Sequence, residues 1–138
     1  MDIETIPTRL GTRQHWEKRV DGWWLEDPVL DVENMARVMG EAEARLVTVT
    51  ARPVKDSTHR LAYHWDLEGQ VLTFITVTRD GAIPSIASIC PAANWIEREV
   101  HDYFAVNFTG REDLSPLLLR SDDPPGMFHW NSKEGGKQ

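Results

Sequence analysis

A central block of alternating apolar and polar residues most constrains what this chain can fold into. It contains three runs with the two-residue period of half-buried β-strands: Leu46–Ala51, His59–Trp65 and Val71–Thr78. The connections between them are short and contain turn-forming residues such as Glu68-Gly69. Short connections favour antiparallel pairing of neighbouring strands. The block therefore predicts a three-stranded antiparallel meander.

Helices are predicted on both sides of this block. Asp31 is a good N-cap, and the apolar residues that follow it have helical spacing up to about Gly40. After the strands, Pro91 suits the first turn of a second helix. The apolar face of that helix is formed by Ile96, Val100, Tyr103 and Phe104. The pattern predicts an α+β fold: a small antiparallel three- to four-stranded sheet with helices packed on one face and an irregular C-terminal segment.

The sequence also suggests a division into three parts. Residues 1–30 have a broken pattern and predict an N-terminal arm with a short helical piece around Thr12–Val20. Residues 31–120 form the α+β domain, and residues 121–138 are expected to be an irregular or disordered tail, because they offer little to bury. The arm is rich in Trp, which we expect to pack back onto the domain; the alternative is that the arm orders only against a partner subunit.

Composition excludes several classes of function. The 138 residues have a net charge of −7, which argues against nucleic acid and against direct docking on an anionic membrane surface. No stretch approaches the ~20 apolar residues needed to cross a bilayer, so we expect a cytoplasmic protein. Cys90 is the single cysteine. We expect it to be a small buried or half-buried hydrophobe, with a pKa lowered by the following helix as the alternative.

Motifs for independent chemistry are weak. The nine glycines form no nucleotide-binding pattern. The best metal candidate is Glu97 with His101 at helical i, i+4 spacing, helped by Asp102, although metal sites need three or four convergent groups. A small stand-alone metal-dependent enzyme using this cluster therefore stays open as an alternative, as does a regulatory adaptor domain.

The second helix has the composition of a protein–protein contact. An uninterrupted Glu-Arg-Glu triplet is followed directly by aromatic residues, and Trp95 lies off the apolar face. Exposed aromatics interleaved with arginine are typical interface anchors. Arg98 is the expected anchor, since a guanidinium makes bidentate contacts with carboxylates. The predicted partner interface comprises Trp95, Glu97, Arg98, Glu99, Asp102, Tyr103 and Phe104, and all of these except Trp95 are alternatively expected to organise the core.

The segment from Ala93 to Phe104, ANWIEREVHDYF, closely resembles the signature of the C-type subunit of respiratory complex I, the NADH-quinone oxidoreductase. Related subunits of energy-converting, membrane-bound nickel–iron hydrogenases share the same segment. The resemblance is specific over Ile83–Leu119. Two positions depart from the pattern: Ala105 stands where the family usually has glycine, and Arg111 where it usually has histidine.

The resemblance implies a non-catalytic peripheral-arm subunit of a complex I-type NADH:quinone oxidoreductase or related hydrogenase. Such a protein would scaffold the large quinone-site or nickel–iron subunit beside iron–sulfur subunits. It would bind no cofactor itself: NADH or ferredoxin, the iron–sulfur clusters and the quinone or nickel–iron centre would belong to partner subunits. It would lie on the inner face of the cell membrane, attached only through the complex.

Overall fold

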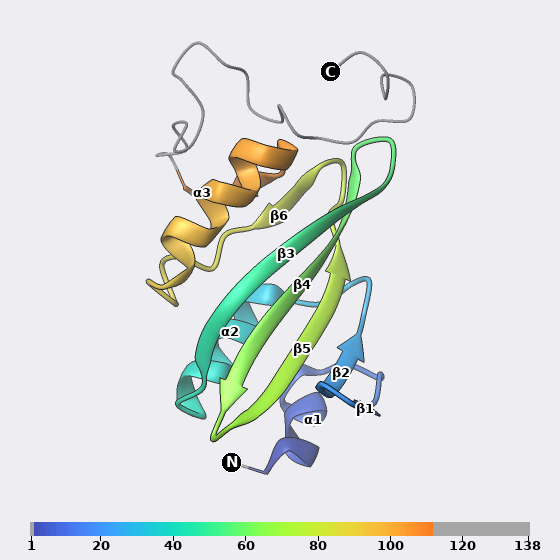
Figure 1. Ribbon diagram of the computed structural model, residues 1–138, viewed down its shortest axis with the longest axis vertical. Helices are drawn as coiled ribbons and strands as arrows, with labels where there is room; N and C mark the ends of the chain where they lie inside the picture. Colours follow the sequence, from blue (N-terminus) through green and yellow to red (C-terminus); the bar gives the residue numbers. More distant parts are fainter. Residues whose placement is uncertain (1, 112–138) are drawn as a thin grey trace.

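The computed structural model describes residues 2–111 (Figure 1). Its centre is a meander of three long antiparallel strands, β3 (Arg45–Lys55), β4 (Thr58–Leu67) and β5 (Gln70–Val77). All three predicted strands are confirmed. The turn between β4 and β5 uses Glu68 and Gly69, both with positive φ (53° and 87°), as expected for a tight hairpin turn. The tail expected at 121–138 lies outside the described residues.

Alternation along the strands directs one face of the sheet to the core. In β4 the residues Leu61, Tyr63 and Trp65 are all buried, as predicted. The alternation in β3 is interrupted: a register shift between Leu46 and Thr48 leaves Val47 51% exposed. The bulge places one more residue on β3 than on β4, so the two-residue alternation of buried and exposed side chains that the sequence predicts is broken at that point.

The N-terminal residues extend this sheet. Strands β1 (Glu17–Arg19) and β2 (Gly22–Glu26) form a hairpin, and β2 pairs in parallel with β5, giving the order β1-β2-β5-β4-β3. The helical piece predicted around Thr12–Val20 is wrong. The helical residues of this part of the chain lie earlier in the sequence, in a 3₁₀ turn, Ile3–Thr5, and the short helix α1 (Ile6–Leu10).

Close packing fixes the position of β2. Gly22 has φ +130°, and a Cβ there would lie 2.3 Å from the backbone oxygen of Val71 on β5. Only glycine fits this approach. Trp16 packs on Phe74 with ring centroids 5.2 Å apart and donates a hydrogen bond to the Ile3 carbonyl (2.7 Å). Trp16 and Trp23 thus pack back against the core, which is the simpler of the two expectations for this segment.

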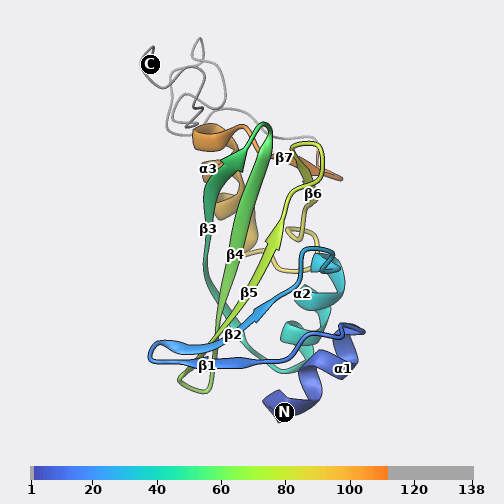
Figure 2. The same cartoon turned by 90° about the vertical axis from the view of Figure 1, so that its right-hand side faces the viewer.

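The helices of residues 2–111 contribute to a core on one face of the sheet, and within this part of the chain no helix covers the other face (Figure 2). Helix α2 (Val32–Glu41) begins at Asp31, whose carboxylate accepts the Asn34 N–H (3.1 Å), which confirms the predicted N-cap. The α+β class and the one-sided helices are confirmed, while the sheet has five strands within the described residues because the N-terminal hairpin adds two. No helix among residues 2–111 is long and apolar enough to cross a membrane.

A small second sheet fixes the last helix of the described residues. Strands β6 (Ala82–Pro84) and β7 (Asn107–Thr109) pair in parallel on either side, in sequence, of α3 (Ala93–Phe104). Two parallel strands that follow one another in sequence are usually connected by an α-helix, as β6 and β7 are here. It brings the two ends of the segment that contains α3 together and fixes the helix beside β3 (Figure 1).

Candidate functional site

Helix α3 contains the residues that the sequence singles out. It begins after Pro91 and ends at Ala105, which adopts the left-handed conformation (φ 59°, ψ 26°) and donates its N–H to the His101 carbonyl. Glycine would adopt this conformation freely, whereas a Cβ in it is strained. Ile96, Val100 and Phe104 pack against the core, as their spacing predicts, whereas Tyr103, the fourth predicted member of that face, is partly exposed and is not part of the core cluster.

Glu97 lies in the buried layer of α3, which the sequence pattern does not predict. Its side chain is fully buried and accepts three hydrogen bonds, from the Ser85 hydroxyl (2.6 Å), the Ile86 N–H (2.8 Å) and the Arg111 guanidinium (3.0 Å). The Arg111 side chain is only 6% exposed. The carboxylate therefore joins the segment after β6, the helix and the residue after β7 into one network.

Arg111 adds further contacts to this network. It donates to the Asn94 backbone oxygen (3.2 Å) and to the Asn94 side-chain oxygen. Arg111 is one of the two positions that depart from the pattern of the resembled family. Its role depends on a partner far away in sequence, which is why sequence reasoning missed it.

The structure divides the predicted interface set by exposure. Trp95 is 57% exposed and is the single aromatic among the exposed large hydrophobic residues of the described chain. Glu97 and Asp102 are fully buried within the chain, so neither offers a surface to a partner in this conformation. The remaining members are partly exposed: Arg98, Glu99, Tyr103 and Phe104. The acidic and basic residues of the triplet thus do not act as one exposed unit.

The candidate metal cluster is not assembled. His101 donates through Nδ1 to the Val106 carbonyl (2.9 Å), and Glu97 is bound by Arg111. Within residues 2–111 no group of three His, Cys, Asp or Glu side chains is placed to hold a metal ion. The described part of the chain gives the metal-dependent alternative no support.

Cys90 is half-buried and packs against the core just before α3. Burial raises the pKa of its thiol, although the backbone N–H groups of Ala93 and Ala92 act in the opposite direction. A pKa lowered by the helix N-terminus is therefore wrong, and the expected half-buried hydrophobe is confirmed.

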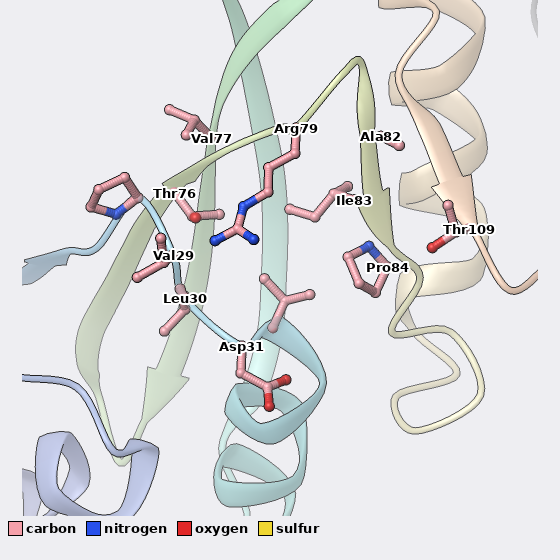
Figure 3. A pocket seen from close by; sticks show the side chains of 12 residues that line it. Val29, Leu30, Asp31, Thr76, Val77, Arg79, Ala82, Ile83, Pro84 and Thr109 are labelled. Atoms are coloured by element: carbon pink, nitrogen blue, oxygen red, sulfur yellow. The ribbon is translucent and has the colours of Figure 1, made fainter.

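A pocket of about 420 Å³ lies between the N-terminus of α2, the end of β5 and β6 (Figure 3). Its walls are largely apolar, with Val29, Leu30 and Ile83 among them. The Arg79 side chain extends across it toward Leu30. Sequence reasoning missed this pocket, because its walls come from segments that only the fold brings together.

The chain is similar in sequence to a family of known proteins. The family model described as "Respiratory-chain NADH dehydrogenase, 30 Kd subunit" matches residues 28–129. The C-type subunit of NADH-quinone oxidoreductase from Ruegeria sp. (strain TM1040) is 36% identical over a segment covering 53% of this chain and 39% of that protein. The corresponding protein of Xanthobacter autotrophicus (strain Py2) is also 36% identical, over 55% of this chain and 42% of that protein. The chain thus spans less than half the length of these curated relatives.

Two solved structures share the fold. The trypsin-resistant fragment of Nqo5 superposes with a TM-score of 0.65 at 20% identity, over 83% of this chain and 100% of that fragment. One component of the membrane-bound sulfane sulfur reductase, an archaeal respiratory membrane complex, superposes with a TM-score of 0.70 at 23% identity, over 96% of this chain and 84% of that component. With the family model covering most of its length, this chain belongs to the family of the 30 kDa subunit of respiratory-chain NADH dehydrogenase.

Proposed function

We propose that this chain is a non-catalytic subunit of a complex I-type NADH:quinone oxidoreductase or of a related energy-converting hydrogenase. Its role would be to hold the large quinone-site or nickel–iron subunit in register with iron–sulfur subunits. NADH or ferredoxin, the clusters and the quinone or nickel–iron centre would all reside in those partners. The protein would then lie at the cytoplasmic face of the membrane through the complex.

One observation carries this proposal: Trp95 is exposed on a helix whose position is fixed by a buried ion pair. A large exposed aromatic on a rigid element loses little conformational freedom on binding, which is the usual property of an interface anchor. Glu97 and Arg111 provide the rigidity, since they tie α3 to the segments on both sides of it. Membership of the family adds support from the sequence.

Arg98 is the second expected contact. It is partly exposed and lies three residues after Trp95 on the same helix. An exposed arginine contributes under about 1 kcal/mol to folding, whereas a buried and paired one contributes about 3–5 kcal/mol. We expect Arg98→Ala to leave the isolated chain folded and to weaken its complex, although the Nε of Arg98 is buried in the isolated chain.

The test is native co-purification of the tagged full chain from its host, with mass spectrometry of the recovered proteins. We expect a large quinone-site or nickel–iron subunit together with iron–sulfur proteins, and reduced recovery with Trp95→Ala or Arg98→Ala. Arg37→Ala, at an exposed arginine of α2, is the control and should recover the partners normally.

Two results would reject the proposal. Recovery of the intact protein alone would favour the adaptor alternative, and a stoichiometric metal in that preparation would favour the enzyme. If Arg98→Ala unfolds the isolated chain, Arg98 is an internal residue and its interface role fails.

A further inference from the structure

The face of the five-stranded sheet that no described helix covers contains a depression of about 400 Å³. Most of the side chains around it alternate with the core-facing residues of β2, β3 and β4, so they point away from the helices. Three of them are arginines, one from each of β1, β3 and β4, and no carboxylate lines it. The lining residues are Arg19, Trp24, Thr50, Ala51, Arg52, Arg60, Ala62, His64 and Ile75.

The three arginines are available to a ligand. Arg19 pairs with Glu17 (3.0 Å) and Arg60 with Glu26 (3.1 Å), but both acids lie outside the lining and are more than half exposed. Exposed ion pairs contribute little to stability, so a better-placed carboxylate can replace them. Arg52 is exposed and forms no ion pair with another described residue.

Trp24 gives the depression an aromatic wall. The Arg19 guanidinium lies 4.3 Å from the centre of the Trp24 ring, and the Trp24 indole N–H donates to Asp21 (2.9 Å). The His64 ring packs edge-on against it at 6.4 Å and is held by Thr73 (2.9 Å). These contacts fix the wall in place, and Trp and Arg are among the residue types most enriched at interface anchors.

His64 does not supply the positive charge. Burial lowers its pKa, and the opposing effect of Asp21 is smaller. The lowered pKa favours the neutral imidazole near pH 7, so the charge of the depression comes from the arginines.

We propose that this depression binds an acidic segment of a partner protein, with carboxylates on Arg52 and Arg60 and an apolar side chain on Trp24. Bidentate arginine–carboxylate pairing supplies the recognition. Nucleic acid is disfavoured because a chain with a net charge of −7 repels a long polyanion, whereas a short acidic segment brings few charges. This surface lies on the sheet and is independent of the α3 contact.

The test is a titration of the ¹⁵N-labelled full-length protein with the blocked peptide Glu-Asp-Phe-Glu-Asp, followed by NMR. The sequence has six tryptophans, so the indole N–H of Trp24 is one of a few resolved signals. We expect that signal to shift saturably, and the peptide Lys-Asn-Phe-Lys-Asn to leave it unchanged. Arg52→Glu and Arg60→Glu should each weaken binding at least tenfold.

Arg37→Glu is the matched control, since it makes the same charge change on exposed α2 and should alter the affinity less than twofold. Arg52 is exposed, so its variant should fold even if Arg60→Glu does not. If Arg37→Glu and Arg52→Glu weaken peptide binding equally, the net charge of the protein explains the loss of affinity, and the proposal is overturned. An unmoved Trp24 signal, or inorganic phosphate binding as tightly as the peptide, would overturn it as well.

Discussion

The buried pair between Glu97 and Arg111 allows a sharp test of what holds α3 in place. Glu97→Gln preserves the shape of the side chain but removes its charge. The carboxylate accepts from three donors, through both of its oxygens. An amide has a single acceptor oxygen, so its NH₂ group must face Ser85 and Arg111 or the Ile86 N–H, and at least one hydrogen bond is lost.

The expected loss is large, because both partners are buried. The substitution leaves the Arg111 guanidinium, 6% exposed, without its carboxylate. Removing one member of a buried ion pair costs about 3–5 kcal/mol. Since glutamine retains part of the hydrogen bonding, we expect the free energy of unfolding to fall by about 3 kcal/mol.

Urea denaturation of the full-length protein measures this change, and urea is preferred because it does not screen charge. Glu99→Gln is the control: it lies two residues further along α3, is partly exposed, and should cost under about 1 kcal/mol. The double variant Glu97→Met with Arg111→Met should cost less than the sum of its single variants, because neither charge is then left unpaired. A loss below about 1 kcal/mol for Glu97→Gln would refute the reasoning.

Two further substitutions test the fold locally. Ala105→Gly should stabilise the protein by about 1 kcal/mol, because glycine adopts the left-handed conformation without strain, whereas Ala92→Gly, at a residue with φ −60°, should destabilise it; thermal unfolding distinguishes the two. Burial, with a smaller effect of Glu97, raises the pKa of Tyr63 above its ordinary 10.0, so the unfolded chain releases that proton first. The contribution of the Tyr63 proton to the free energy of unfolding is fully present below pH ~10 and is lost at higher pH, by up to about 1.4 kcal/mol per pH unit. Urea denaturation at several pH values should show that Tyr63→Phe abolishes this loss and that Tyr103→Phe retains it. Equal slopes of stability against pH for the two variants would contradict the prediction.

Local patterns were sufficient for the long elements. The meander and α2 could be predicted because alternation, turn residues and the N-cap at Asp31 all act within a few residues of one another. The short strands could not. The pairing of β2 with β5 depends on a distant segment, and nothing in the composition of Gly22–Glu26 states which strand lies beside it.

The candidate site shows the same division. The exposure of Trp95 follows from its place off the apolar face, and the structure confirms it. The burial of Glu97 could not be predicted from the helical pattern, because a charged residue is expected on the surface unless its partner is known. That partner, Arg111, lies beyond β7 and reaches the helix only through the parallel pairing of β6 and β7.

The parallel pairing of β2 with β5 has a consequence for synthesis of the protein. A ribosome delivers Gly22–Glu26 well before Gln70–Val77, so β2 emerges with only β1 to pair with. The antiparallel hairpins of the meander form from neighbouring segments, but the N-terminal hairpin must wait for the last of those strands. During that interval one edge of β2 stays unpaired, and Trp23 and Trp24 lack the neighbours that β5 later provides.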